Sequence, residues 1–371
     1  MRFLRIDEHS PFRQLVGVGG LGTGMFFALE GDHTLGRNES RLGSLLDVRD
    51  YCKLHITTHY VAKLLGAEQG QFPVVPLGKV GDDAAGVFVV REMRNVGIDT
   101  RFVEVVSGKP TLFSVCFQYP DGSGGNLTTS NSAAADLSEE DIDRAGSLLA
   151  SIGATTVALL VPEVPLTIRK HFLGMAKANG AFCVSSFVSG EIHEAKRLGM
   201  FDQLDLVSFN EEEAAEFLSS GAYAAGRPEA YVDQLSCLLA STHPHLSLIM
   251  SVGKSGAYFV NRTGWSYSRA PKVDVASTAG AGDCLLGGVL AAIATGISLP
   301  NPQRQTSTTP MLANALDFGV LLASYKVGSP HTIHPHASLD DVLQFAERLA
   351  ISVASEIQQL VTSLEVVKTK G

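Results

Sequence analysis

The stretch AGAGDCLLGGVL, residues 279–290, decides the fold that we expect for this chain. Its small residues allow a tight backbone turn, and the apolar residues that follow have helical spacing and predict a buried helix. The glycines therefore lie at a helix N-terminus, where free N–H groups and the positive end of the helix dipole favour an anion such as phosphate.

One carboxylate, Asp283, stands beside this predicted anion site. Phosphoryl transfer requires stabilised charge on the moving group and a base that accepts the proton of the attacking hydroxyl. We therefore expect Gly280, Ala281 and Gly282 to form an anion hole and Asp283 to be the general base. The simpler alternative is that Asp283 only caps a core helix, which is a common role for aspartate.

The order of motifs around this stretch resembles the ribokinase-like (PfkB) family of sugar and nucleoside kinases. The family signature is Asp-Thr-x-Gly-Ala-Gly-Asp, and residues 277–283 read STAGAGD, which fits at six of seven positions. The resemblance implies an ATP-dependent kinase acting on a hydroxymethyl group, with Thr278 beside the nucleotide. Ser277 stands where the family has Asp, which bears on how the loop is held and on any monovalent cation bound nearby.

Short apolar runs alternate with helical patterns along the chain, which is typical of a parallel sheet covered by helices on both faces. Strands are predicted at residues 14–19, 74–79, 156–161, 182–186, 206–209, 246–251 and 257–260, and helices at 57–65, 83–96 and 165–178. The resemblance implies an α/β fold, a ribokinase-like three-layer α/β/α sandwich with a mostly parallel central sheet.

Two segments break this rhythm, at about residues 25–50 and 101–131. Both predict strands outside the main sheet. In ribokinase-like proteins such segments form a small β-sheet lid, which excludes water from the reaction. We expect one kinase domain over residues 1–371 with these lid segments inserted, and the resemblance allows a homodimer through the lid strands. The alternative is a pair of long surface loops.

The run NEEE at residues 210–213 follows a predicted strand and opens a helix. Ligands in such sheets bind beyond the carboxyl ends of the strands. The resemblance matches Asn210 and Glu213 to an Asn-x-x-Glu motif that positions hydrated Mg²⁺ against the nucleotide phosphates. Magnesium keeps most of its waters, so one amide oxygen and one carboxylate are enough. Acidic residues also favour helix N-termini without any metal.

Residues 251–257, SVGKSGA, resemble the Thr-x-Gly-x-x-Gly turn on the nucleotide side of the family. Ser251, Gly253 and Gly256 would then lie near the ribose and phosphates, although a glycine turn between two strands explains the pattern equally well. Asn314 lies on a helix that walls the adenine pocket in the family, which makes it a candidate contact of the base or ribose.

The acceptor side departs from the family. No carboxylate follows the first strand in GLGTGM (residues 20–25), CKLHITTH (52–59) lacks the Gly-Gly-x-x-x-Asn helix opening, and SSFVS (185–189) replaces Asp-x-Asn-x-Arg. These losses indicate a different acceptor.

Polar residues of the first lid segment could supply the missing contacts. Asp32 and Glu39 can accept hydrogen bonds from hydroxyl groups, Arg37 could pair with an acidic group, and Asn38 lies between them in the sequence. A solvated lid edge is the alternative explanation for this run.

Composition limits the remaining classes of function. A formal charge of −9 without a cluster of Lys and Arg argues against nucleic-acid binding. The five cysteines are scattered without CxxC spacing, so no disulfide framework or zinc site is expected. We also expect no signal peptide and no membrane span, and therefore a cytoplasmic protein whose ligands are ATP, Mg²⁺ and a small molecule.

Two other functions fit parts of the sequence. A nucleotide or metabolite sensor without catalysis would explain the lost acceptor motifs and Ser277. A dinucleotide-dependent oxidoreductase is suggested by GVGGLG at residues 17–22, but a short apolar run interrupted at Gly31 follows where the pyrophosphate needs a long helix.

Overall fold

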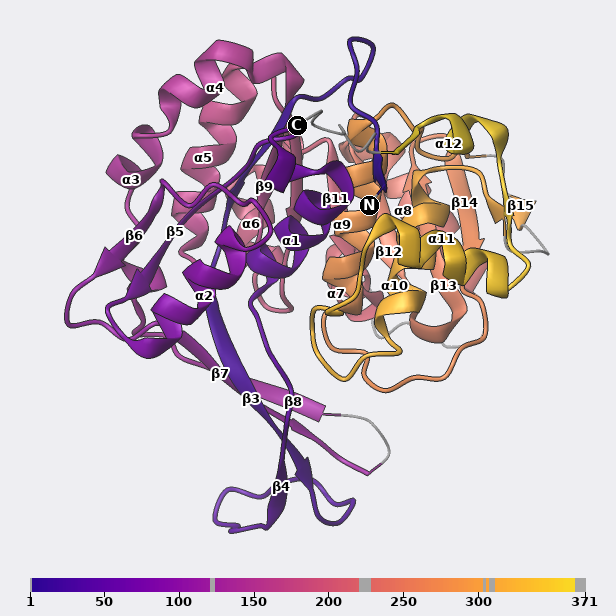
Figure 1. The fold of residues 1–371 in the computed structure, drawn as a ribbon. Coiled ribbons are helices and arrows are strands. Elements are labelled where there is room, and N and C mark those ends of the chain that lie inside the picture. The colour runs from indigo at the N-terminus through magenta and orange to yellow at the C-terminus, as the bar shows by residue number, and fades with distance from the viewer. Residues whose placement is uncertain (1, 121–123, 220–227, 303–304, 307–310, 364–371) are drawn as a thin grey trace, which may run out of the picture.

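The computed structural model describes residues 2–120, 124–219, 228–302, 305–306 and 311–363. Its largest sheet runs in parallel from β6 to β12, β13 and β14 are antiparallel, and β15 lies parallel to β14 (Figure 1). The strand order is β15 (Gln305–Thr306), β14 (Gly264–Arg269), β13 (Gly256–Asn261), β12 (Ser247–Ser251), β11 (Leu206–Phe209), β10 (Phe182–Ser186), β9 (Thr156–Leu160), β2 (Gln14–Val18), β5 (Val74–Gly81) and β6 (Val103–Val106).

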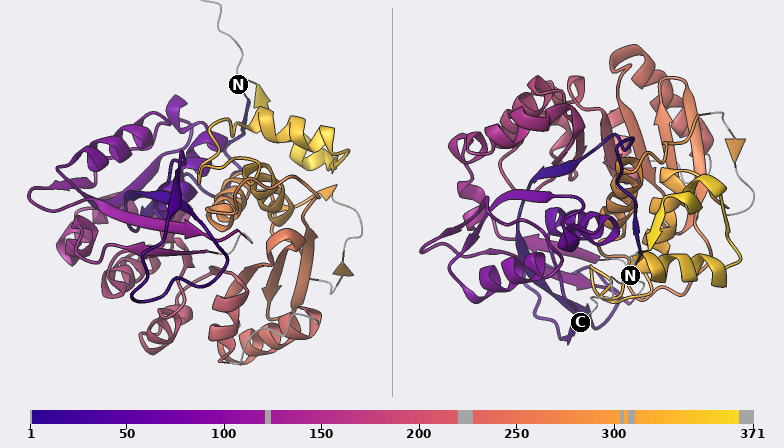
Figure 2. Two further views of the ribbon diagram at one scale, coloured as in Figure 1. Left: turned by 90° about the horizontal axis from the view of Figure 1, so that it is seen from below. Right: turned by 45° about the horizontal axis from the view of Figure 1, so that its top comes forward.

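Helices cover both faces of this sheet (Figure 2). Successive strand residues point to opposite faces, so Leu15 belongs to one apolar core and Val16 to the other. The first core includes α1 (Lys53–Leu65), α2 (Ala84–Arg94), α9 (Ala281–Ala294), α10 (Ala315–Lys326) and α11 (Leu339–Arg348). The second includes α3 (Glu139–Asp143), α4 (Gly146–Ile152), α5 (Leu166–Ala178), α6 (Ile192–Arg197), α7 (Glu211–Leu218) and α8 (Pro228–Thr242).

Helix α9 packs between α1 and α10, and small residues make this close approach feasible. A Cβ on Gly288 would lie 3.0 Å from the Cα of Gly319 on α10. Because α9 is buried along its length, its N-terminal loop is held at a fixed place relative to α1 and α10.

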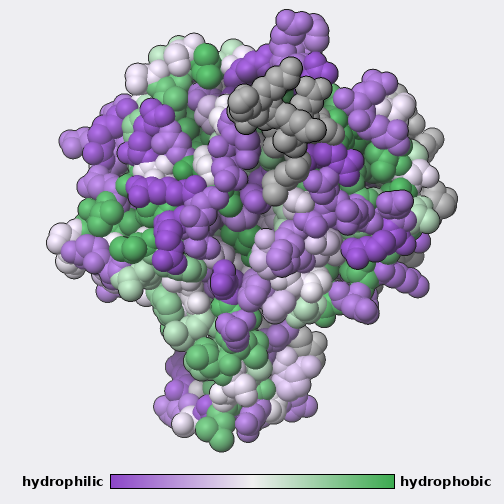
Figure 3. All heavy atoms as spheres, in the orientation of Figure 1, coloured by the Kyte–Doolittle hydropathy of each residue, from purple (hydrophilic) through white to green (hydrophobic). Residues whose placement is uncertain are grey.

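A second sheet projects from the body of the molecule (Figure 1). Its order is β4 (Gly43–Leu46), β3 (Gly22–Leu29), β7 (Leu112–Gln118) and β8 (Gly124–Thr128). The two predicted lid segments therefore do form a small separate sheet. Its surface carries apolar side chains (Figure 3), and Leu42, Leu45 and Leu127 are 75%, 61% and 74% exposed.

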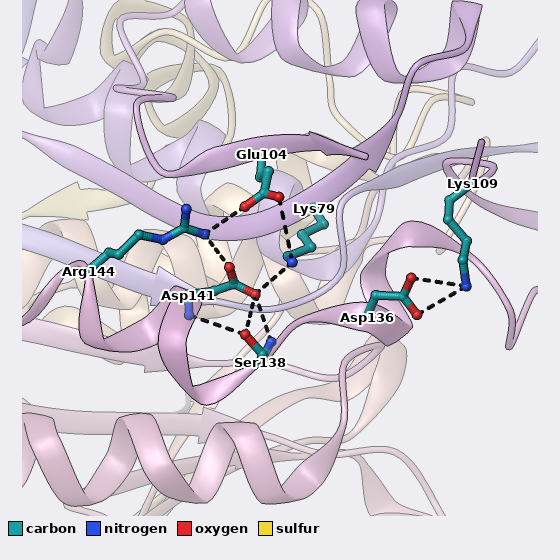
Figure 4. Close-up of polar contacts among 7 residues, drawn as sticks. All are labelled: Lys79, Glu104, Lys109, Asp136, Ser138, Asp141 and Arg144. Atoms are coloured by element: carbon teal, nitrogen blue, oxygen red, sulfur yellow. Dashed lines mark hydrogen bonds and ion pairs between the residues drawn. The ribbon is translucent and has the colours of Figure 1, made fainter. Parts of the chain in front are cut away.

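One part of the lid prediction is wrong. Strand β6, inside the second segment, pairs in parallel with β5 at the edge of the main sheet. A charged network fixes this edge to α3 (Figure 4): the Lys79 ammonium lies 2.7 Å from Asp141 and 3.8 Å from Glu104, and Arg144 lies 2.6 Å from Glu104. The alternation of apolar and polar residues predicted a strand here but not which sheet it joins.

The predicted strands and helices are otherwise confirmed, with shifts at their ends. The first helix begins at Lys53 instead of residue 57, and the helix predicted from residue 83 begins at Ala84, capped by Asp83, whose Oδ1 accepts the N–H of Gly86 at 2.8 Å. All five cysteines are free. No helix among the described residues is long and apolar enough to cross a membrane.

Short elements complete the described chain. Strand β1 (Arg2–Leu4) pairs with β18 (Val361–Ser363), and β16 (Met311–Leu312) pairs with β17 (Ser352–Val353), next to α12 (Ser355–Gln359). The 3₁₀ helices are η1 (Ala67–Gln69), η2 (Ala133–Asp136), η3 (Gly153–Thr155), η4 (Met200–Asp202) and η5 (Gly253–Ser255).

Candidate active site

The N-terminus of α9 has the geometry of an anion site. Gly280 caps the helix at φ 74°, a left-handed conformation that favours glycine, and a Cβ there would lie 2.7 Å from the carbonyl oxygen of Thr332. Beside Gly282, by contrast, a Cβ would meet no atom within 4 Å. The helix therefore begins against open space.

Not every N–H group of this turn is available to a ligand. The N–H of Ala281 donates to the carbonyl oxygen of Thr278 at 3.0 Å. Within the described part of the chain, the N–H groups of Gly280, Gly282 and Asp283 have no hydrogen-bond acceptor. These three amides, with the dipole of α9, can stabilise an anion.

Asp283, in the first turn of α9, faces a lysine that the sequence did not single out. The ammonium of Lys53, in the first turn of α1, lies 3.5 Å from Oδ1 of Asp283. The charges of Asp283, Glu163 and Glu213 raise the pKa of Lys53 to about 12 against the effect of burial. Lys53 therefore stays protonated at any physiological pH, and it neutralises part of a carboxylate-rich site.

Glu163 is a second carboxylate of this group. It follows β9 with φ 77°, and a Cβ on Gly20 would lie 2.8 Å from its Oε2. This oxygen is buried and has no hydrogen-bond partner among the described residues. Burial, with the charges of Asp283 and Asp50, raises the pKa of Glu163 to about 7 although Lys53 opposes the shift. The carboxyl group also interacts with the Cys52 thiol and with the charge of Lys53, so only its Oε2 lacks a partner. A buried oxygen without a hydrogen-bond donor is costly, so we interpret this oxygen as a ligand contact.

Asp50 is the third carboxylate and reaches the lid. Its main-chain oxygen accepts a hydrogen bond from the Thr23 hydroxyl of β3 at 2.8 Å. The side chain is 8% exposed, and burial raises its pKa to about 6, with Asp283 acting in the same direction. Asp50 thus lies where the lid sheet meets the body of the protein.

Asn210 and Glu213 form a capping box at the start of α7. The Glu213 N–H donates to Oδ1 of Asn210 at 2.8 Å, and the Asn210 N–H donates to Oε2 of Glu213 at 2.8 Å. Glu213 is only 8% exposed, and burial raises its pKa to about 7. A buried carboxylate favours a cation, and each side-chain oxygen keeps a lone pair. The pair therefore fits Mg²⁺ held largely through water.

The predicted nucleotide residues lie at neighbouring strand and helix ends. Ser251 ends β12 and donates to the carbonyl oxygen of Phe209 at 3.5 Å. Gly253 and Gly256 have φ of 53° and 123°. Asn314 caps α10 by accepting the N–H of Asp317 at 3.1 Å, and its amide nitrogen donates to the Asp317 carboxylate at 2.7 Å. These contacts give Asn314 a structural role, and binding of the base stays a prediction.

The predicted acceptor residues Asp32, Arg37, Asn38 and Glu39 lie between β3 and β4 in the lid. Glu39 accepts hydrogen bonds from Arg41 at 2.6 Å and from the Gly36 N–H at 2.8 Å, and these bonds lower its pKa to about 2. Within the described ranges no hydrogen bond or ion pair connects the four residues with Asp283. Their part in acceptor binding stays a prediction.

Four residues near the site were missed: Asp50, Lys53, Glu163 and Lys326. Glu163 follows a strand at the ligand-binding edge, so its position was a usable signal. The places of Asp50, Lys53 and Lys326 near the site depend on tertiary contacts, which no local sequence pattern contains. The GVGGLG run, in turn, leads into strand β3 and not into a helix, so a dinucleotide pyrophosphate finds no helix N-terminus there.

Comparisons with known proteins give matches over most of the chain. A family model described as "pfkB family carbohydrate kinase" matches residues 57–339. The ribokinase of Dictyostelium discoideum is 25% identical over 218 residues, which cover 56% of this chain and 67% of that protein.

Two solved structures share the fold. Ribokinase from Cryptococcus neoformans var. grubii serotype A in complex with ADP has a TM-score of 0.71 at 20% identity, over 90% of this chain and 99% of that chain. Burkholderia thailandensis nucleoside kinase in complex with inosine has a TM-score of 0.67 at 15% identity, over 91% and 99%. These likenesses confirm the ribokinase-like fold.

Proposed function

Because the chain belongs to the pfkB family of carbohydrate kinases, we propose that it transfers the γ-phosphoryl group of ATP to a hydroxyl group of a sugar, sugar derivative or nucleoside. One observation carries this proposal. Asp283 lies in the same turn as three free amides, those of Gly280, Gly282 and Asp283 itself, beside open space and opposite Lys53. An anion site and a base in one turn are what phosphoryl transfer needs.

The step proceeds as a single displacement. The acceptor oxygen forms a bond to the γ-phosphorus while the bond from that phosphorus to the β,γ-bridging oxygen breaks, and ADP leaves with this electron pair. The Asp283 carboxylate accepts the proton of the acceptor hydroxyl. The N–H groups of Gly280, Gly282 and Asp283 stabilise the negative charge on the moving group.

Lys53 and the pair Asn210 and Glu213 complete the charge balance. Lys53 keeps its proton and orients the Asp283 carboxylate between α1 and α9. Asn210 and Glu213 would hold Mg²⁺, which neutralises charge on the phosphates when it is bound.

Asp50 and Glu163 supply carboxylates on the acceptor side, where the family motifs are lost. Both are hydrogen-bond acceptors and suit the hydroxyl groups of a sugar or of a nucleoside ribose. Negative charge at this end disfavours an anionic acceptor, so we propose a neutral one. The two neighbouring structures hold ADP and inosine, and this supports a nucleotide site together with a neutral acceptor.

A sensor that binds nucleotide without catalysis is the second candidate, because Ser277 and the lost acceptor motifs favour it. Measuring ADP formation from Mg-ATP with and without an added acceptor distinguishes the kinase from the sensor. A kinase forms ADP only when the acceptor is present, and this activity is lost in Asp283→Asn. A sensor binds Mg-ATP and transfers no phosphoryl group.

A further inference from the structure

Lys326, the last residue of α10, is fully buried and has an unusual environment. Its ammonium donates hydrogen bonds to two backbone carbonyl oxygens, that of Ser277 at 3.1 Å and that of Ala279. No carboxylate of the described residues forms an ion pair with it within 4.0 Å. A buried charge without a paired carboxylate is costly, so plain packing would favour an apolar residue here.

The two carbonyls belong to the loop that leads into the anion site. The loop also donates hydrogen bonds to the end of α10. The N–H groups of Ala276 and Ser277 donate to the carbonyl oxygen of Val327 at 2.8 and 3.2 Å. The Ser277 hydroxyl accepts the N–H of Ala279 at 3.2 Å. The loop is thus held at the C-terminal end of α10 by four hydrogen bonds, two donated by Lys326 and two accepted by Val327.

Peptide geometry links this contact to catalysis. The carbonyl of Ala279 and the N–H of Gly280 belong to one planar trans peptide, so they point in opposite directions. When the Ala279 oxygen turns toward Lys326, the Gly280 N–H turns away from it, into the anion site. The ammonium also adds positive charge behind the amides.

We infer that Lys326 is a built-in cation that positions the anion-site loop and makes a bound monovalent cation unnecessary for turnover. It is a positioning residue, because it acts through the backbone of residues 277–280. The inference rests on the kinase function proposed above. Ser277 in place of the Asp of the family signature is consistent with this inference. The carbonyl dipoles of Ser277 and Ala279 stabilise the ammonium charge, so a carboxylate at position 277 is not needed for that purpose.

The groups that act on Lys326 come from three directions. Burial lowers its pKa to about 8, and the charges of Asp283 on α9 and of Asp50 before α1 oppose this shift. Cys284 on α9 is a neutral thiol at this pH, because burial raises its own pKa. His334, beyond α10, is itself affected by the Lys326 charge, and burial lowers its pKa. Lys326 is therefore charged at neutral pH and loses its proton above pH 8.

The test compares the full chain with Lys326→Met, Lys326→Arg and the control Lys196→Met. Lys196 also donates to a backbone carbonyl, that of Phe217 at 2.5 Å, but from α6 on the opposite face of the sheet. We measure kcat and KM against pH, with K⁺, Na⁺ or N-methylglucammonium as the only monovalent cation. Binding of Mg-ADP with and without fluoroaluminate, a mimic of the transferred phosphoryl group, is measured in parallel.

For Lys326→Met we expect kcat to fall about 100-fold with KM for the acceptor nearly unchanged, since misplacing a catalytic group by about 1 Å has such an effect. Wild-type kcat should decline above pH 8, and the decline should vanish in Lys326→Arg because guanidinium stays charged. Changing the monovalent cation should leave wild-type kcat unaltered. Normal turnover in Lys326→Met, or a wild-type requirement for K⁺, would overturn the inference.

Failure of the kinase proposal is distinguishable from failure of this inference. If the wild type phosphorylates no acceptor, the fluoroaluminate measurement still reports on the anion site. A loss of about tenfold in fluoroaluminate-dependent affinity in Lys326→Met, with Mg-ADP affinity unchanged, supports the positioning role. Equal affinities in Lys326→Met and Lys196→Met contradict it. Thermal unfolding of each variant identifies a general loss of structure, and in that case the pH profile of Lys326→Arg decides.

Discussion

The ammonium of Lys53 lies 3.5 Å from the Asp283 carboxylate and joins the first turns of α1 and α9. The hydroxyl of Thr57, one turn further along α1, donates to the main-chain oxygen of Asp283 at 3.4 Å. The proposed base is therefore fixed by both its side chain and its backbone. The position of Asp283 on α9 thus depends on α1, although more than 200 residues separate Lys53 and Asp283 in the sequence.

Replacing Lys53 by Met should lower kcat about 10- to 100-fold, because Asp283 loses its orienting partner and several carboxylates lose their counter-charge. Steady-state kinetics with Mg-ATP measures this. The control is Lys63→Met in the last turn of the same helix, which should retain wild-type rates. Equal rates in the two variants would contradict the role of Lys53.

Glu213→Gln should raise the Mg²⁺ concentration needed for half-maximal rate about tenfold. Glutamine keeps an oxygen for the capping box, so α7 remains capped while the charge is lost. Glu212→Gln, an exposed neighbour in the same turn, is the control and should leave the Mg²⁺ dependence unchanged. A Glu213→Gln enzyme with the wild-type Mg²⁺ dependence would assign Glu213 to helix capping alone.

Glu163 should make stability depend on pH. Its pKa is raised from 4.5 to about 7 in the folded chain, so the native state binds more protons than the unfolded state between these values. Stability from this group is present below pH 4.5 and is lost as the pH rises to 7. Glu163→Gln should therefore increase Tm by about 2–5 °C at pH 8 and little at pH 5, as followed by calorimetry.

The same variant should raise the acceptor KM, because the carboxylate is proposed to bind acceptor hydroxyls. A site that is destabilising and functional is expected to trade stability for activity. Unchanged KM together with unchanged Tm at pH 8 would remove Glu163 from the acceptor site.

The exposed apolar surface of the lid predicts self-association. Leu127 on β8 is 74% exposed, and β4 and β8 are the edge strands of the lid sheet. Size-exclusion chromatography with light scattering should show a dimer for the wild type and a monomer for Leu127→Arg. Val87→Arg on α2, where the residue is 66% exposed, should leave the dimer intact. A monomeric wild type would refute this prediction.

The parts of the fold that follow from local pattern were predictable. The strands at 182–186 and 206–209 were bounded as predicted, because each is a short and mainly apolar segment, as is typical of a buried parallel strand. The start of α1 at Lys53 was missed, since Cys52 supplies no side-chain cap and the first turn contains no acidic residue. Assignment of β6 to the main sheet depends on pairing with β5, which no local pattern contains.

The candidate site divides in the same way. The helix N-terminus at Asp283 and the glycines before it was predictable because such a terminus has a local sequence pattern, and the roles of these residues in catalysis stay predictions. Lys326 was not found, because a lysine at the end of a helix usually interacts with the helix dipole, and only packing of α10 against α9 brings its ammonium to residues 277 and 279. Asp50 was missed for the same reason.

The most direct test of the proposed kinase is ADP release from Mg-ATP across a panel of sugars, sugar acids and nucleosides, with Asp283→Asn as control. We predict release that depends on a neutral sugar or nucleoside and falls by at least about 100-fold in the variant, with Mg-ATP affinity retained. No acceptor-dependent release by a wild type that binds Mg-ATP, or full turnover in Asp283→Asn, would contradict the account.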